Sequence, residues 1–288
     1  MKPKILILTP VYNDWENLIK LLNKINKIFI KEIKSRFDLI VVDDFSNEKI
    51  HYENLKLKSI NKLKIIKLHK NHGSQRALAI GLKFIKEFYS KNYRVIVIDS
   101  DGQDNPKGII EMFKKIKINS NYSIVVKRGQ RKEPIWFKIF YEIYCLIITF
   151  LSFKRMRHGN FSSLSKNDVN KIVKDYNLWN AFPPTLSNNI KNLKYITLDR
   201  EKRFSGNSKM NFLGLILHAL KVFSVLRLEI LISSIIYIFL SYLVFFEKNI
   251  IFFIMISLFL ILINLINFGL SFSTKKKFLF SYKKIEIL

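Results

Sequence analysis

Cysteine is nearly absent from this sequence, since Cys145 stands alone in 288 residues. A single thiol excludes an intramolecular disulfide and any zinc site built from several cysteines. Proline and glycine are also scarce, with six and nine residues, which excludes a collagen-like or linker-like chain. Because 49% of the residues are hydrophobic, the chain can form a core, and a disordered protein is excluded as well.

Acidic residues are few. Asp and Glu total 22 against 49 Lys and Arg, so the formal net charge is +27. Such a surplus suits nucleic acid, an anionic membrane surface or phosphorylated small molecules. The basic residues form no long arm and no zinc-finger, KH or RNP-type motif. Nucleic acid is therefore not an expected partner.

Apolar residues are concentrated near the C-terminus. Uncharged runs occupy residues 230–246 (ILISSIIYIFLSYLVFF) and 250–273 (IIFFIMISLFLILINLINFGLSFS). A membrane-spanning helix needs about 20 apolar residues, so we predict a transmembrane hairpin over residues 228–274. The lysines at 275–277 are expected on the cytoplasmic side, and two spans would then place the basic N-terminal part in the cytoplasm too.

Two further apolar segments precede this hairpin. Residues 135–153 (IWFKIFYEIYCLIITFLSF) include Trp136, Tyr141 and Tyr144, residue types that favour a membrane interface. We predict a helix lying in the headgroup region there, with an ordinary buried helix as the alternative. Residues 211–227 (NFLGLILHALKVFSVLR) are interpreted as a second such helix.

The first 130 residues alternate between strand-like and helix-like patterns. Ser74 is expected to cap one helix, and Pro106 to occupy the first position of another. The alternation predicts an α/β fold with a mostly parallel sheet and helices on both faces. The expected strands are residues 4–8, 38–42, 63–68, 94–98 and 123–126, and the clearest helices are residues 14–29 and 74–88.

Polar residues follow three of the expected strands. They are residues 9–14 (TPVYND), Asp43 with Asp44, and residues 99–101 (DSD). Ligands of parallel sheets bind outside the carboxyl ends of the strands. The acidic residues of this basic protein are thus expected to converge at the edge of a binding site.

Glycine-rich phosphate loops are lacking, because neither G-x-G-x-x-G nor G-x-x-x-x-G-K-[ST] occurs. A Rossmann dehydrogenase and a P-loop NTPase are therefore not expected. Asp99 and Asp101, which follow a hydrophobic strand, could instead hold Mg²⁺ or Mn²⁺, since these ions prefer carboxylate oxygens. Such a metal would bridge the oxygens of a diphosphate and stabilise it as a leaving group.

Six ordered motifs carry a resemblance to a known family. They are residues 9–14 (TPVYND), 42–46 (VDDFS), 71–77 (NHGSQRA), 99–104 (DSDGQD), 127–131 (KRGQR) and 203–209 (RFSGNSK). The chain resembles a family 2 glycosyltransferase with the GT-A fold. Within that family it is similar to the membrane-attached branch that includes dolichol-phosphate mannose synthase and bacterial polyprenyl-phosphate glycosyltransferases.

The chain also departs from the pattern of this branch. Gly102 stands where leucine is common, and Asn207 and Met210 replace the usual acidic and aromatic residues. Residues 158–162 (HGNFS) stand where many relatives have a D-F-R-type stretch. These differences concern the sugar and the acceptor more than the fold.

The resemblance implies four regions. They are a nucleotide-sugar-binding GT-A core (1–134), an acceptor-side region with interfacial helices (135–227), the transmembrane hairpin (228–274) and a cytoplasmic basic tail (275–288).

The resemblance also implies roles for individual residues. Of the two adjacent acids at 43 and 44, we favour the second for contact with the base or ribose. The implied nucleotide-sugar site comprises Pro10, Tyr12, Asp14, Asp43, Asp44, Asp99, Ser100 and Arg128. The metal ligands would be Asp99, Asp101 and Gln103. The acceptor phosphate would meet Arg131, Arg203, Ser208 and Lys209. The catalytic set would be Asp101, Asp104, Arg128, Arg203 and Lys209.

The implied reaction is inverting transfer of a sugar from a nucleotide-diphosphate sugar to polyprenyl phosphate, with Mg²⁺ or Mn²⁺, for cell-surface glycan assembly. The enzyme would be an integral protein of the bacterial inner membrane with a cytoplasmic catalytic domain, and a homo-oligomer stays open. One alternative is transfer to a sugar hydroxyl of a lipid-linked acceptor, which would want a carboxylate base such as Asp104. The other is a non-catalytic membrane binding module.

Overall fold

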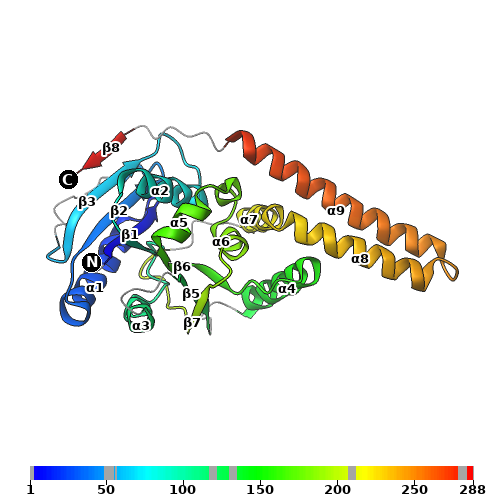
Figure 1. Ribbon diagram of the computed structural model, residues 1–288, viewed down its shortest axis with the longest axis horizontal. Coiled ribbons are helices and arrows are strands. Elements are labelled where there is room, and N and C mark those ends of the chain that lie inside the picture. Colours follow the sequence, from blue (N-terminus) through cyan, green and yellow to red (C-terminus); the bar gives the residue numbers. More distant parts are fainter. Residues whose placement is uncertain are drawn as a thin grey trace. The chain divides into compact units, whose positions relative to one another are not determined.

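The structure is a computed structural model that describes residues 3–48, 55, 57–116, 122–129, 135–206, 212–277 and 284–287. The chain divides into two compact units. The first comprises Met1–Lys132, His158–Ser208 and Phe280–Leu288, and the second comprises Glu133–Arg157 and Lys209–Leu279. The elements of both units are labelled in Figure 1.

An eight-stranded sheet lies at the centre of the first unit as far as the chain is described, with strand order β7-β5-β6-β4-β1-β2-β3-β8 (Figure 1). Its pairs are parallel except where β6 meets β4 and β5 and where β8 meets β3. The predicted mostly parallel α/β sheet is confirmed. The strands are β1 (Lys4–Val11), β2 (Phe37–Asp43), β3 (Ile60–Lys67), β4 (Tyr93–Val97), β5 (Ile124–Arg128), β6 (His158–Ser165), β7 (Lys194–Leu198) and β8 (Lys284–Ile287).

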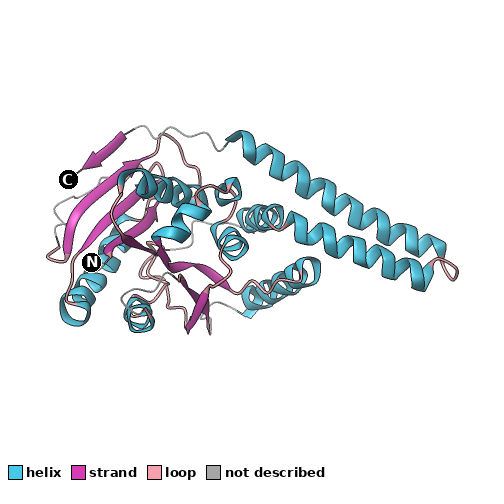
Figure 2. Cartoon of the chain, in the orientation of Figure 1, coloured by secondary structure: helices cyan, strands magenta, loops and turns pink. Residues whose placement is uncertain are grey.

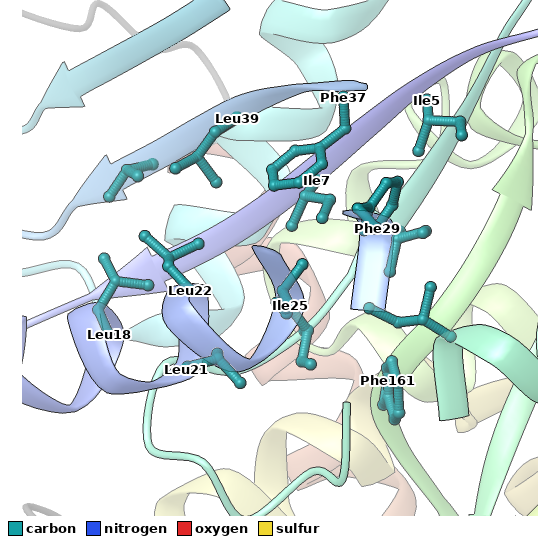
Figure 3. Close-up of a cluster of buried hydrophobic side chains, with 14 of the residues drawn as sticks. Ile5, Ile7, Leu18, Leu21, Leu22, Ile25, Phe29, Phe37, Leu39 and Phe161 are labelled. Atoms are coloured by element: carbon teal, nitrogen blue, oxygen red, sulfur yellow. The ribbon is translucent and has the colours of Figure 1, made fainter. Parts of the chain in front are cut away.

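One face of the sheet is covered by α1 (Trp15–Ile28), the π-helical turn η1 (Phe29–Ile33) and α3 (Gly108–Lys115). Apolar residues recur at helical spacing along α1, so one side of the helix enters the core. Figure 3 shows this packing, and the residues concerned are fully or almost fully buried. The helix contributes Leu18, Leu21, Leu22 and Ile25, and the strands contribute Ile5, Ile7, Phe37 and Leu39.

The opposite face carries α2 (Ser74–Phe88), α5 (Lys166–Ile172), the 3₁₀ turn η3 (Tyr176–Trp179) and α6 (Phe182–Asn189). Helices therefore lie on both faces of the strands (Figure 2). Helix α2 approaches β1 so closely that a Cβ added at Gly81 would lie 2.4 Å from Leu8 Cδ1. A larger residue at this point of contact would force the Leu8 side chain to shift within the packed core.

Two details of the predicted helix starts are wrong. Gly73, with φ of 84°, precedes α2, and Ser74 is the first helical residue with no side-chain cap. Helix α3 begins at Gly108 rather than Pro106, because the chain first makes a tighter turn in which Ile109 N donates to Pro106 O at 3.0 Å. Such 3₁₀-type turns are common at helix starts.

The second unit is helical and consists of α4 (Ile135–Ser152), α7 (Phe212–Val225), α8 (Arg227–Phe245) and α9 (Ile250–Lys277). Arg227–Phe245 and Ile250–Ser271 are long and apolar enough to cross a membrane, with mean hydropathy of 2.2 and 2.7. They lie against each other through a polar contact in which Asn264 Nδ2 donates to Ser234 Oγ at 2.8 Å. Hydrogen bonds of this kind join apolar helices in lipid.

Helix α4 presents an apolar face to its surroundings. Its exposed side chains include Phe140, Leu146 and Phe150, whereas Cys145 and Ile148 are buried. Within this unit Tyr237 Oη donates to Phe150 O at 2.6 Å, which ties α4 to α8. An exposed apolar face favours the interfacial helix over an ordinary buried one, and the interfacial location stays a prediction.

Candidate active site

The carboxyl ends of β1, β2 and β4 meet at one edge of the sheet, because these strands are parallel neighbours. The loops that follow β1 and β2 brace each other. Asn13 N donates to Ser46 Oγ at 2.9 Å, and Asn47 N donates to Asn13 Oδ1 at 2.8 Å. Asn13 and Phe45 have φ of 46° and 73°, and such strained backbone often marks a functional site.

Asp44 directly follows β2 and is almost fully buried. Its carboxylate accepts hydrogen bonds from the backbone N–H groups of His72 and Gly73, both at 2.7 Å. Burial raises the pKa of Asp44 to about 6, against the lowering effect of these two bonds. The carboxylate thus fixes the turn that leads into α2, and its contact with a nucleotide stays a prediction.

Three carboxylates gather in the loop after β4. Burial, together with the charges of Asp104 and Asp101, raises the pKa of Asp99 to about 7. Burial also raises the pKa of Asp104, whereas the charges of Arg128 and Arg200 lower it. Gln103 belongs to the same loop, and its backbone N donates to Asp101 Oδ1 at 3.0 Å. The predicted acids Asp99, Asp101 and Asp104 are therefore close enough for their charges to act on one another.

Arginine side chains enter the same region from β5 and from the loop after β7. Arg128 lies so close to Gly159 that a Cβ there would meet its Nη2 at 2.5 Å. Its Nε is buried with no hydrogen-bond partner among the described residues. A small pocket is lined in part by Arg128, Arg200, Asp104 and Gln103. The pocket therefore combines donors for an anion with carboxylates for a cation.

The loop after β7 is held onto the acidic cluster by Arg203. Its Nη2 lies 2.6 Å from Asp14 Oδ1, and its Nη1 lies 3.6 Å from Asp101 Oδ2. Asn17 secures the same loop, because its Nδ2 donates to Asp14 Oδ1 at 2.8 Å and to Ser205 O at 3.0 Å. Segments distant in the sequence, after β1, β4 and β7, thus share one network.

A profile of the family described as Glycosyl transferase family 2 matches residues 6–178, more than half of the chain. The chain belongs to this family. A glycosyltransferase of Synechocystis sp. described as uncharacterised is 28% identical over 72% of this chain and 64% of its own length. The undecaprenyl-phosphate 4-deoxy-4-formamido-L-arabinose transferase of Proteus mirabilis is 28% identical over 47% of this chain. The match spans 40% of that relative, so the chain aligns with less than two thirds of either one.

The fold of this family 2 member is shared with solved structures. Glucosyl-3-phosphoglycerate synthase from Mycobacterium tuberculosis, in complex with Mn²⁺, UDP and glucosyl-3-phosphoglycerate, has a TM-score of 0.54. The match covers 79% of this chain and 80% of that chain at 12% sequence identity. The likeness confirms the expected GT-A fold.

The residues after β4 carry donor atoms of the kind that a divalent cation prefers, although the described residues contain no group of three or more His, Cys, Asp or Glu side chains placed to hold a metal ion. Asp99, Asp101 and Gln103 supply carboxylate and amide oxygens, the donors that Mg²⁺ and Mn²⁺ prefer. Burial, followed by the negative charges of Asp104 and Asp101, raises the pKa of Asp99, and a cation among these carboxylates would relieve their repulsion. That Asp99, Asp101 and Gln103 hold a metal stays a prediction.

Other predicted site residues have varied surroundings. Pro10 lies within β1 and is buried, Tyr12 directly follows that strand, and Ser100 is 8% exposed beside the acidic cluster. Asp43, at the end of β2, accepts a hydrogen bond from Ser46 N at 3.0 Å. The predicted residues Arg131, Ser208 and Lys209 lie outside the described residues, and their roles stay predictions.

Sequence reasoning missed several polar residues that the fold brings to this network. Asn17 could have been found from the sequence, because helical spacing places this amide on the apolar side of α1. In the structure it is buried there. Asn160 lies on β6, and its Nδ2 donates to Asp99 Oδ1 at 3.0 Å. Arg200 follows β7 and faces Asp104. No sequence pattern pointed to Asn160 or Arg200, because β6 and β7 were not expected as strands.

Gly102 is required by its packing against Phe204. A Cβ at Gly102, whose φ is 76°, would lie 2.1 Å from Phe204 Cε2. Replacing Gly102 with leucine, the residue common in relatives, is therefore expected to lower the free energy of unfolding by about 2–4 kcal/mol, through backbone strain and overpacking. Denaturant unfolding checks this. Gly206→Ala is the control, since Gly206 has φ of 71° and open space around it, and it should cost only about 1 kcal/mol. Equal losses in the two variants would refute the packing argument.

His158 should make stability depend on acid pH. Burial lowers its pKa from 6.5 to about 4, and its Nε2 lies 2.9 Å from Ser187 Oγ. The folded state then binds fewer protons than the unfolded state, so stability is lost as pH falls from about 6.5 to about 4. His158→Gln keeps a partner for Ser187 without titrating. Between these two pH values, the unfolding free energy should fall by up to about 3 kcal/mol less in His158→Gln than in the wild type. An equal fall in both proteins would show that His158 does not cause this pH dependence.

Proposed function

We propose that this chain is an inverting, metal-dependent glycosyltransferase that moves a sugar from a nucleotide-diphosphate sugar to a polyprenyl-phosphate lipid carrier. The observation that carries the proposal is the position of Arg203. Its guanidinium joins Asp14 after β1 to Asp101 after β4, at 2.6 and 3.6 Å. A sugar donor carries a negative diphosphate, which suits the guanidinium of Arg203, and a divalent cation bound to it suits the carboxylates.

In this proposal the protein acts by positioning and by charge. Asp99, Asp101 and Gln103 would hold Mg²⁺ or Mn²⁺, which would neutralise the diphosphate as it leaves. The buried Nε of Arg128 has no partner among the described residues, so it can donate to a phosphate oxygen. The planar guanidinium of Arg203 can donate paired hydrogen bonds to phosphate oxygens as well. The acceptor phosphate is already anionic, so no strong base is needed.

A lipid acceptor is supported by the helices of the second unit. Helices α8 and α9 have the length and hydropathy of membrane spans, and α4 has an exposed apolar face. The relative from Proteus mirabilis is described as an undecaprenyl-phosphate transferase. We propose an integral protein of a bacterial inner membrane, with its catalytic unit in the cytoplasm and a role in cell-surface glycan assembly.

The second candidate is transfer to a sugar hydroxyl of a lipid-linked acceptor. The pKa of Asp104, raised by burial, favours it, since a carboxyl with a raised pKa suits a general base. Asp104 also faces Arg128 and Arg200, however, and these charges lower its pKa. These two charges make the carboxylate a weaker base than burial alone would make it, so the lipid-phosphate acceptor is preferred.

Label transfer to lipid tests the proposal. Membranes that carry the protein would be incubated with labelled UDP- and GDP-sugars, Mg²⁺ or Mn²⁺, and undecaprenyl phosphate, with Asp101→Asn beside the wild type. Label in an acid-labile lipid fraction, lost in the variant, is the expected result. Nucleotide release stimulated only by a glycolipid extract would move the assignment to the hydroxyl acceptor. Lack of turnover with every donor would contradict both reactions.

A further inference from the structure

A chain of amides connects α6 to the carboxylate of Asp99. Phe182 N donates to Gln75 Oε1 at 2.7 Å, and Gln75 Nε2 donates to Asn160 Oδ1 at 3.1 Å. Asn160 Nδ2 then donates to both oxygens of Asp99, at 3.0 and 3.3 Å. Asn160 is only 7% exposed. The three hydrogen-bonding residues come from α6, α2 and β6, and none belongs to the loop that carries Asp99.

The direction of donation along these hydrogen bonds is fixed by the backbone N–H of Phe182, where the series begins. A backbone N–H can only donate, so Gln75 must turn its Oε1 toward Phe182 and its Nε2 toward Asn160. Asn160 must then accept with its Oδ1, which leaves its amide N–H groups for Asp99. The orientation of each amide follows from the partner before it, and Asp99 always meets a donor.

A fixed donor matters at this position because Asp99 has two carboxylate neighbours. The charges of Asp104 and Asp101 both act on it, and repulsion would favour rotation of its carboxylate away from them. Asn160 contacts both of its oxygens, so the amide restricts that rotation. Partners that orient a metal-binding side chain commonly decide metal affinity.

We propose that Gln75 and Asn160 are positioning residues that set the Asp99 carboxylate for the metal-bound diphosphate of the donor. The inference rests on the proposed function, because it assumes that nucleotide and metal bind at this edge. Neither residue touches the donor in this scheme. The amide relay formed by Gln75 and Asn160 acts only through Asp99.

The test compares nucleotide affinity with and without metal. Binding of UDP and of GDP to the purified full-length protein would be measured by calorimetry, once with Mn²⁺ and once with EDTA. In the wild type, Mn²⁺ should strengthen binding of the preferred nucleotide. Asn160→Leu removes the amide that donates to Asp99 without adding a charge and should cut this metal-dependent gain by about 10–100-fold. The affinity measured in EDTA should stay within about twofold, because the direct nucleotide contacts remain.

A second variant acts one residue further away. Gln75→Glu keeps an oxygen for Phe182 N but turns its other oxygen toward Asn160, which must then flip and present its Oδ1 to Asp99. The loss of metal-dependent gain should resemble that of Asn160→Leu. Asn26→Ala is the matched control, because Asn26 Oδ1 accepts from Ser59 N at 3.0 Å and from Ser59 Oγ at 2.6 Å, beside the start of β3. This control should lower stability and leave the gain unchanged.

Several outcomes would overturn the inference. The inference fails if both relay variants keep the wild-type gain in nucleotide affinity with Mn²⁺. It also fails if Asn26→Ala loses as much of this gain as the relay variants do, because the loss would then follow from lower stability in general. A wild type that binds neither nucleotide would contradict the inference together with the proposed function. A wild type whose metal-dependent gain is lost in the relay variants, but which transfers no sugar to lipid phosphate, would sustain the relay and refute only the acceptor.

Discussion

Sugar transfer is expected to fall by roughly 10²–10³-fold when Asp101 is replaced by asparagine. Asparagine keeps an oxygen for Gln103 N, which donates to Asp101 Oδ1 at 3.0 Å, so the turn is preserved. The amide nitrogen of the new side chain would replace Oδ2, which faces Arg203 Nη1 at 3.6 Å. The variant therefore loses the negative charge for a metal and places two donors against each other. Initial rates of label transfer to undecaprenyl phosphate measure the effect.

A charge removed elsewhere should have little effect on this rate. Glu16→Gln is the matched control, because Glu16 lies in the first turn of α1 and is paired with Lys20 at the surface. Transfer by this variant should stay within about twofold, since exposed ion pairs contribute little. Comparable losses in Asp101→Asn and Glu16→Gln would show that net charge, rather than the position of Asp101, governs the rate.

Replacing Arg203 with glutamine is expected to lower transfer by roughly 10²-fold or more. Arg203 contacts Asp14 and Asp101 and donates from Nε to Ser205 O at 2.9 Å. Glutamine cannot make these three contacts together, so two carboxylates lose their shared cation and the loop after β7 loses its anchor. The phosphates of donor and acceptor would also lose a planar donor. Steady-state rates at several donor concentrations measure the loss.

Two companion variants sharpen this prediction. Lys202→Gln removes an exposed cation from the neighbouring position and should leave the rate within about twofold. Arg203→Lys keeps the charge but cannot form the fork that reaches both carboxylates, so it should recover only part of the activity. Full activity of Arg203→Lys would mean that Arg203 contributes charge alone, and loss in Lys202→Gln would mean that the whole loop is sensitive.

The sequence predicted the fold where local pattern and burial agree. Helix α1 and the central strands are apolar at the expected spacing, so they were found to within a few residues. Strand β6 was missed, because its sequence HGNFSSLS is mostly polar although every residue of it is buried. Its polar side chains have partners from other elements, such as Asn160 with Gln75. No local pattern contains that information.

The acidic half of the candidate site could also be predicted. Asp99 and Asp101 follow an apolar strand, and parallel strands bring their carboxyl ends together. The contacts that orient these acids depend on segments far along the chain: Asn17 reaches Ser205 and Arg203 reaches Asp14. Gly102 is the clearest case, because its departure from the family pattern is explained only by the ring of Phe204. Packing partners of this kind are set by tertiary structure.

In the proposed reaction, the carboxyl edge of the sheet binds a nucleotide diphosphate through a divalent cation. The most direct measurement is calorimetry of the purified protein with UDP and with GDP, each in Mn²⁺ and in EDTA. We expect one nucleotide to bind in Mn²⁺ and EDTA to weaken this binding by about tenfold or more. Binding of neither nucleotide, or binding of equal strength with and without Mn²⁺, would contradict it.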